Sequence, residues 1–328
     1  MTAALQCLSH TPVMNRVTLN PELEGEVRRA LAAARDRATR FAPELIVLFG
    51  PDHFNGVMHD MMPPFCIGAM AESIGDYGTA KGPLTVPTAL AMDCASSVLD
   101  SGIDVAVSHR LRVDHGFAQP LELLTERIDR VPVLPVFINC IAAPLTSMTR
   151  IRLLGNAIGR YLAQEQTDKR ILIVGSGGLS HDPPIPSLET GSEAVRHRLM
   201  NGLVRTPEEQ SAHEARVVEA ARAFAQPGYS GSGGMSMAPL NPEWDMRILN
   251  LLCSGHPSSL DAMTNAEIVA AGGKSAQEIR TWVAAFACLA AFGPSEAHID
   301  YYHAIPDWVA GFAIVHAESR LEHPHFAP

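Results

Sequence analysis

The sequence lacks the features that mark secreted or membrane-spanning chains. Its 328 residues include only six cysteines, which lie far apart and form no CxxC pair. A dense disulfide framework is therefore excluded, and reduced core thiols are expected. No segment offers roughly 18 uninterrupted apolar residues for a membrane span, and the N-terminus has no basic start followed by a long apolar run. We expect a cytoplasmic chain.

Positive charge is also scarce. Lysine and arginine number 25 against 35 aspartates and glutamates, which gives a formal net charge of −10. Such a chain has no long-range field to attract nucleic acid or an anionic membrane, so neither is an expected partner. An acidic small substrate would need a local basic group, and no basic run in the sequence identifies one.

What the sequence does contain is the composition of an ordinary folded protein, with 47% hydrophobic and 18% charged residues and no repeat. Single cores stop growing at roughly 250 to 300 residues. We therefore expect one domain over 1–328, built either as one unit or as two intimately joined halves. The glycine- and serine-rich stretch near 227–241 predicts a mobile loop.

Short apolar runs alternate with helical patterns along the chain. Strands are predicted at 4–8, 45–49, 104–108, 131–139 and 171–174. Helices are predicted at 21–41, 87–99, 145–164, 207–225, 242–253 and 275–291. The alternation indicates an α/β fold with a mixed or mainly parallel central sheet flanked by helices. In such folds the site lies at the strand ends.

Four histidines follow strand-like runs, each in a turn rich in Gly, Pro, Asp or Ser: His10, His53, His115 and His181. A single histidine near a turn is more often hydrogen-bonded or exposed than functional. Four in the same kind of position favour convergence at one edge of the sheet. The segment GSGGLS before His181 lacks the full dinucleotide pattern, because position 180 is serine. It is either a tight turn that presents His181 or an ordinary glycine cluster.

Taken together, eight segments closely resemble the bacterial 2,3-dihydroxyphenylpropionate 1,2-dioxygenases. They are CLSHTP, FGPDHFNG, MPPFC, VDHGFAQPLE, LPVFIN, GSGGLSHDPP, NPEWD and GKSAQEIRTWVAAF, and they span nearly the whole chain. These enzymes are type II extradiol dioxygenases, the superfamily that includes the protocatechuate 4,5-dioxygenase catalytic subunit. The resemblance implies one extradiol-dioxygenase catalytic domain.

The resemblance also implies a metal site. It assigns Fe(2+) to His10, His53 and a carboxylate of NPEWD, for which we choose Glu243, with Asp245 as the alternative. Asn-Pro-Glu also occurs at 20–22, where capping of a helix explains it. Two histidines and one carboxylate on one face of an octahedral iron leave positions open for a catechol and dioxygen.

The other two histidines match the acid and base of the family. His115 is expected to be the proton donor and His181 the proton acceptor, with the reverse assignment left open, since imidazole titrates near neutrality. Asp114 is a candidate to orient His115. The implied substrates are O2 and 3-(2,3-dihydroxyphenyl)propionate or 2,3-dihydroxycinnamate, and the propionate would give 2-hydroxy-6-oxonona-2,4-diene-1,9-dioate. The resemblance further implies a homo-oligomer.

Several alternatives stay open at this point. Lys274 could hold the propionate tail or be a solvated helix-start lysine. Three aromatic residues could wall the ring or pack in the core: Phe54, Phe117 and Trp244. Other readings are an extradiol enzyme for another catechol, a metal-dependent hydrolase, because the same ligand set suits zinc, or a non-enzymatic binding protein.

Overall fold

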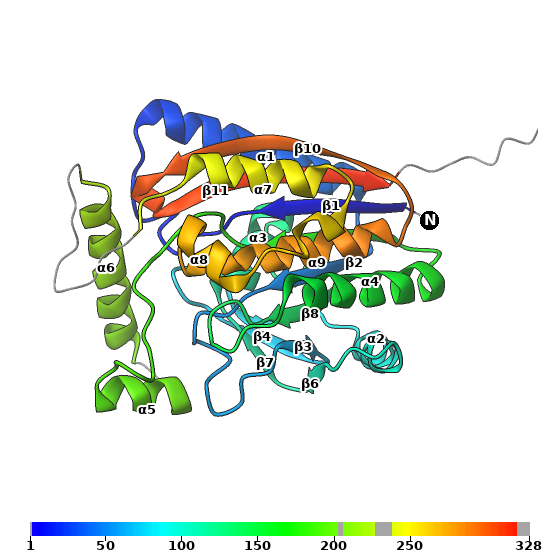
Figure 1. Ribbon diagram of the computed structural model, residues 1–328, viewed down its shortest axis with the longest axis horizontal. Helices are drawn as coiled ribbons and strands as arrows, with labels where there is room; N and C mark the ends of the chain where they lie inside the picture. Colours follow the sequence, from blue (N-terminus) through cyan, green and yellow to red (C-terminus); the bar gives the residue numbers. More distant parts are fainter. Residues whose placement is uncertain (1, 203–205, 227–237, 320–328) are drawn as a thin grey trace, which may run out of the picture.

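The computed structural model describes residues 2–202, 206–226 and 238–319 (Figure 1). The strands are β1 Thr2–Leu8, β2 Leu45–Gly50, β3 Phe65–Gly68, β4 Ala71–Ile74, β5 Lys81–Pro83, β6 Ala106–Ser108, β7 Leu111–Val113, β8 Val133–Ile138, β9 Arg170–Ser176, β10 Ser295–Ile305 and β11 Ala310–Ser319. The α-helices are α1 Pro21–Phe41, α2 Thr88–Asp100, α3 His115–Thr125, α4 Met148–Glu165, α5 Glu193–Asn201, α6 Pro207–Phe224, α7 Pro242–Cys253, α8 Asn265–Gly272 and α9 Ile279–Ala290, with a 3-10 turn, η2, at Ser275–Glu278. Most of the loop predicted near 227–241 lies outside the described residues.

The main sheet has eight strands in the order β10-β11-β1-β9-β2-β8-β3-β6. Its centre is parallel, because β9 pairs in parallel with both β1 and β2, and β2 pairs in parallel with β8. Antiparallel pairs join β11 to β1 and β3 to β8. A second sheet has the order β5-β4-β7. The prediction of an α/β fold with a mixed sheet between helices is confirmed.

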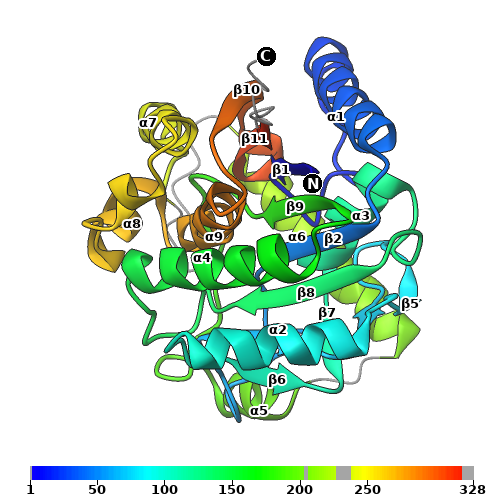
Figure 2. The same ribbon diagram turned by 90° about the vertical axis from the view of Figure 1, so that its right-hand side faces the viewer.

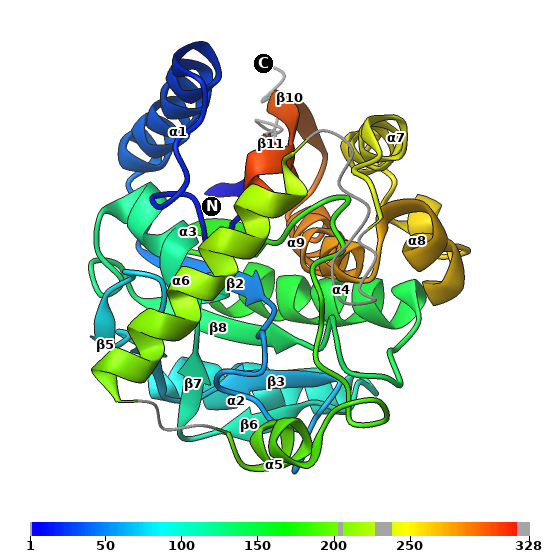
Figure 3. The same cartoon turned by 90° about the vertical axis from the view of Figure 1, so that its left-hand side faces the viewer.

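Helices cover both faces of the main sheet, so its central strands are apolar on both sides. On β2, Leu45, Val47 and Phe49 belong to one core, and Ile46 and Leu48 belong to the other. The first core includes side chains of α2, α4, α7 and α9, and the second includes side chains of α1, α3 and α6. Figures 2 and 3 show α1 and α3 on one side of the sheet and α4 and α9 on the other.

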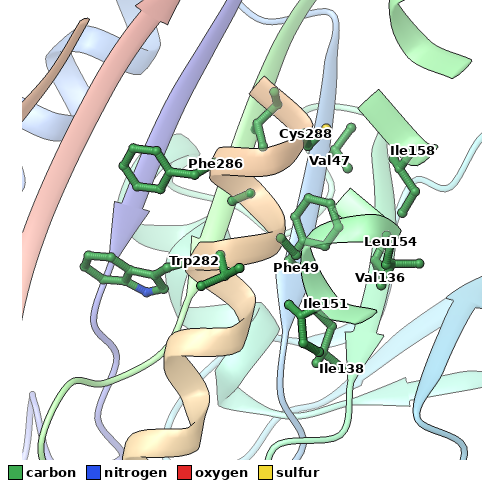
Figure 4. Close-up of a cluster of buried hydrophobic side chains, with 14 of the residues drawn as sticks. Val47, Phe49, Val136, Ile138, Ile151, Leu154, Ile158, Trp282, Phe286 and Cys288 are labelled. Carbon is green, nitrogen blue, oxygen red and sulfur yellow. The ribbon is translucent and has the colours of Figure 1, made fainter. Parts of the chain in front are cut away.

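Helix α9 packs tightly against both the sheet and the neighbouring helix α4. A Cβ atom added at Gly155 of α4 would lie 2.2 Å from the carbonyl oxygen of Ala284, and one at Gly159 would lie 2.4 Å from that of Cys288. Only glycine allows the two helices to approach so closely. In Figure 4 side chains of α9 mesh with those of α4, β2 and β8. The packing fixes the N-terminal end of α9 relative to the ends of the strands.

The predicted elements mostly match the structure. The helices predicted at 21–41 and 242–253 coincide with α1 and α7, and the helix predicted at 275–291 is η2 followed by α9. All five predicted strands are present as β1, β2, β6, β8 and β9. Three helices and six strands were not predicted: α3, α5, α8, β3, β4, β5, β7, β10 and β11. Within the described ranges, no helix combines the length and apolarity of a membrane span.

Candidate active site and metal centre

Four histidines that follow strands meet at one place, three of them at the carboxyl ends of neighbouring strands. His10 follows β1, His53 follows β2 and His181 follows β9, and these three strands are adjacent in the sheet. His115 follows β7 and opens α3. The Nε2 atoms of His10 and His53 are 3.5 Å apart. The His115 ring lies 5.4 Å from the His10 ring and stacks on His53 at 4.4 Å between centroids.

A buried carboxylate completes the cluster, and it belongs to Glu278 at the junction of η2 and α9. One of its oxygens is 3.2 Å from Nε2 of His53 and 3.4 Å from Nε2 of His181. The other is 3.8 Å from Nε2 of His10. The Glu278 residue is 1% exposed. Glu278 is therefore the carboxylate that the structure places among the histidines.

The predicted ligand Glu243 does not belong to this cluster. It is exposed on the first turn of α7 and does not line the cavity at the histidines. The side chain of Asn241 accepts a hydrogen bond from the Trp244 N–H and so caps α7, as Asn20 caps α1. Both Asn-Pro-Glu segments are thus helix starts. We replace Glu243 by Glu278 in the candidate ligand set.

The alternative ligand Asp245 is buried but has other partners. Its carboxylate accepts hydrogen bonds from the backbone N–H of Ser180 at 2.7 Å, from the Ser180 hydroxyl at 2.8 Å and from the Tyr302 hydroxyl at 2.8 Å. Burial raises the pKa of Asp245 above its usual value, although these hydrogen bonds oppose the rise. Asp245 ties α7 to the turn before His181 and to β10.

Hydrogen bonds at the far side of each ring determine which nitrogen faces the cluster. The Ser176 hydroxyl donates to the Gly116 carbonyl at 2.6 Å, so it can only accept from Nδ1–H of His10, at 2.9 Å. Nδ1 of His53 donates to the Asp114 carboxylate at 2.9 Å. In its neutral form each ring therefore presents an unprotonated Nε2 toward Glu278, as metal-binding histidines do.

These donor atoms fit a divalent metal ion. Ligand atoms about 2.0 to 2.2 Å from one ion lie roughly 3 to 3.5 Å apart, close to the separations around Glu278. Burial lowers the pKa of His10 to about 3, which keeps this ring neutral. Burial works against ionisation of Glu278, but the neighbouring imidazoles, His181 above all, outweigh it and hold the pKa of Glu278 well below its usual value. His10, His53 and His115 also form a group with donor atoms within 4.8 Å of one another.

His115 and His181 have different partners. Nδ1 of His115 lies 2.6 Å from the Asp76 carboxylate and 4.0 Å from that of Asp114, so Asp76 orients this ring, and the expected role of Asp114 is corrected. Nε2 of His115 is buried and, among the described residues, has no hydrogen-bond partner. Nδ1 of His181 donates instead to the Leu179 carbonyl at 2.9 Å.

The glycine turn before His181 binds the side chain of Glu278. The N–H of Gly178 donates to Glu278 at 2.8 Å. A Cβ at Gly178 would lie 2.7 Å from the His181 ring, and one at Gly177 would lie 2.8 Å from the Glu278 carbonyl oxygen. The turn is tight because α9 and His181 approach its backbone on both sides. Of the two interpretations of this glycine segment, the structure supports a tight turn that presents His181.

The cluster opens into a cavity of about 270 Å³. All four histidines, Glu278 and Phe54 line it, whereas Phe117 and Trp244 are buried in the cores and Lys274 is exposed elsewhere. The sequence did not point to several other lining residues, among them Tyr77, Arg198, His213, Glu278 and Trp308. Glu278 lies within one of the resembling segments, and the other four follow no strand-end pattern that could have identified them.

Comparison with known proteins identifies the class of this site. Residues 4–313 match the family described as the catalytic LigB subunit of aromatic ring-opening dioxygenase. The chain belongs to this family. It is an extradiol catechol dioxygenase, an enzyme of a metal-dependent group, which agrees with the histidine-rich centre.

Several individual proteins of known name are similar to this chain over nearly its whole length. The chain is 53% identical over 318 residues to the 2,3-dihydroxyphenylpropionate/2,3-dihydroxicinnamic acid 1,2-dioxygenase of Cupriavidus pinatubonensis, covering 97% of this chain and 99% of the relative. It is 50% identical to the enzyme of the same name from Klebsiella pneumoniae, covering 98% and 100%. It is also 48% identical to that of Mycolicibacterium paratuberculosis, covering 96% and 98%.

Proposed function

We propose that this protein uses dioxygen to open the ring of 3-(2,3-dihydroxyphenyl)propionate, and of the corresponding cinnamate, beside the two hydroxyl groups. The propionate would give 2-hydroxy-6-oxonona-2,4-diene-1,9-dioate. The observation that carries the proposal is the cluster of the His10 and His53 Nε2 atoms, one buried carboxylate and two further histidines at an apolar cavity. The names of the full-length relatives support the choice of substrate.

His10, His53 and Glu278 are the proposed ligands, and Fe(2+) is the proposed metal. Bound there, the ion would supply a Lewis-acidic, redox-active centre that brings catechol and dioxygen together. Ser176 and Asp114 aim the two imidazoles at it, and the Gly178 N–H holds the carboxylate. Fixed ligands lower the cost of assembling the site on each turnover.

His115 and His181 are the proposed proton donor and acceptor. The Asp76 carboxylate holds Nδ1 of His115 at 2.6 Å, and the buried Nε2 has no hydrogen-bond partner among the described residues, so this nitrogen is placed to deliver a proton to the substrate. His181 rests on a neutral carbonyl, which fixes the proton on Nδ1 and leaves Nε2 to accept one from a catechol hydroxyl. The partners thus favour His115 as donor and His181 as acceptor.

The proposal is tested by anaerobic loading of the protein with Fe(2+) or, in parallel, Zn(2+), followed by oxygen-electrode and absorbance measurements with the propionate. We expect uptake of one O2 per substrate and a yellow ring-opened product with iron alone. Verified iron-loaded protein that consumes no oxygen with this substrate would refute the proposed substrate. Hydrolytic activity of the zinc form alone would instead support a hydrolase.

Two further predictions remain proposals for this chain. Assembly into a homo-oligomer follows from the family resemblance, and mass photometry of the purified protein tests it. A cytoplasmic location follows from the scattered cysteines and the composition, and fractionation of the native cells tests it.

A further inference from the structure

The cavity has two unlike walls. The strand-end wall carries the histidines and Glu278, whereas the opposite wall is formed by the segment 183–186 and by α5 and α6. Figures 1 and 3 show α5 and α6 standing together at one end of the molecule, across the carboxyl ends of the parallel strands. The lining side chains of this second wall are largely apolar: Pro183, Pro184, Ile185, Pro186, Val217, Ala220 and Ala221.

One charged side chain interrupts the apolar wall, that of Arg198 on α5. Among the described residues that line the cavity, Arg198 is the single lysine or arginine. It is half-buried, and no ion pair or side-chain hydrogen bond links its guanidinium to the described part of the chain. Arg16 and Arg152, by contrast, are paired with Glu214 and Asp261.

A fixed positive charge beside an apolar cavity, in a chain of net charge −10, suits an anionic ligand group. Building on the proposed function, we propose that Arg198 binds the side-chain carboxylate of the substrate while the catechol end meets the histidines on the opposite wall. The apolar side chains of 183–186 and α6 then cover the two-carbon arm. Arg198 is thus the residue that selects acidic catechols over neutral ones.

The earlier candidate for this role, Lys274, does not fit. Its side chain is exposed and outside the cavity lining, while its backbone N–H donates to Asp182 at 3.0 Å. An ammonium group would also be a weaker choice, because guanidinium can bind a carboxylate with two parallel hydrogen bonds. The local basic group required by the charge balance is therefore assigned to α5.

The test compares two substrates in three variants of the iron-loaded enzyme. Arg198→Gln removes the charge, Arg198→Lys keeps it, and Arg196→Gln is the matched control, since Arg196 is an exposed residue of α5 outside the cavity lining. The kcat/KM is measured for the propionate and for 3-propylcatechol, which has the same arm length without a charge. Circular dichroism and Tm establish that each variant is folded.

We expect Arg198→Gln to lower kcat/KM for the propionate about 10- to 100-fold, the usual effect of losing a charge-assisted hydrogen bond. The value for 3-propylcatechol should stay within about threefold, and Arg198→Lys should recover part of the loss. Calorimetric titration of the metal-free protein with the propionate should show the same weakening. Equal losses for both substrates, or a selective loss in Arg196→Gln, would overturn the assignment.

The outcomes also separate this inference from the proposed function. If the wild-type enzyme prefers the propionate and Arg198→Gln keeps that preference, the substrate stands and the role of Arg198 is refuted. If the wild-type enzyme turns over 3-propylcatechol as efficiently as the propionate, the proposed substrate and the role of Arg198 both fail. A preference that collapses only in Arg198→Gln supports both.

Discussion

The two walls of the cavity are built in opposite ways. On the strand-end wall each functional side chain has a buried partner: Ser176 for His10, Asp114 for His53, Asp76 for His115 and Gly178 for Glu278. On the helical wall the side chains are mostly apolar apart from Arg198 and His213, and no ion pair or side-chain hydrogen bond links the Arg198 guanidinium to the described residues. Groups that hold a metal ion or transfer a proton must be fixed in position. Groups that recognise a substituent can instead form their contacts when the substrate arrives.

The largest effect is expected at Glu278. Glu278→Gln removes the negative charge from the candidate metal centre with little change in size, so the protein should lose most of its iron and turnover should fall to the detection limit. The matched control Glu243→Gln should keep both. Metal analysis of the purified, reconstituted variants decides between them. Full iron in the Glu278 variant with loss in the Glu243 variant would restore the original assignment.

A large effect of another kind is expected at His115 and His181, the proposed proton-transfer pair. His115→Ala and His181→Ala should each retain iron, while kcat falls about 10²- to 10⁴-fold, the usual range for a lost general acid or base. Metal content and steady-state oxygen uptake are measured on the same samples. Loss of iron from His115→Ala would show that this ring is itself a ligand within the group of three histidines.

An intermediate effect is expected at the two carboxylates that hydrogen-bond to His53 and His115. Asp114→Asn weakens the hydrogen bond that orients His53 and should reduce iron affinity about 10- to 100-fold. Asp76→Asn, whose partner is His115, should leave the iron affinity nearly unchanged and lower kcat instead. Competition titrations with a metal chelator measure the first, and oxygen uptake at saturating iron measures the second. The opposite pattern would mean that the two carboxylates have been assigned to the wrong rings.

The smallest effect on the metal centre is expected from Asp245→Asn. The carboxylate accepts three hydrogen bonds on its two oxygens. An amide has one oxygen that accepts and one NH2 group that only donates, so it cannot accept all three. The free energy of unfolding should fall by about 1 to 3 kcal/mol. Urea denaturation measures this loss. Iron per folded molecule should stay at the wild-type level, and a clear drop would bring Asp245 back as a ligand.

The sequence predicts the strands of the sheet centre well because both of their faces are buried. A run such as LIVLF is apolar throughout, and it forms β2. The C-terminal hairpin of β10 and β11 was missed, although exposure alternates along 295–300. Its apolar positions alternate with Glu, His and Asp, which is the pattern of a half-buried strand and differs from the uninterrupted apolar runs of the sheet centre. Helix α3 was missed because Gly116 and Pro120 lie within it.

The site was predicted in part for the same physical reason. Adjacent parallel strands bring their carboxyl ends together, so the histidines that follow them had to lie close. Glu278 obeys no such rule, because an acid near a helix start is usually explained by the helix dipole. Its burial beneath three imidazoles appears only when α9 is packed against the sheet. The Asn-Pro-Glu segment drew attention to Glu243 instead, although capping accounts for it.

The first turn of α3 is linked by hydrogen bonds to both candidate metal-binding rings and carries His115, the proposed proton donor. Asp114 caps this helix through the Gly116 N–H and also accepts from Nδ1 of His53. The Gly116 carbonyl accepts from Ser176, which orients His10. One turn of backbone thus helps to orient the imidazole rings of His10, His53 and His115. Any substitution that loosens it should misalign the whole reaction centre at once, so that metal retention and proton delivery decline together.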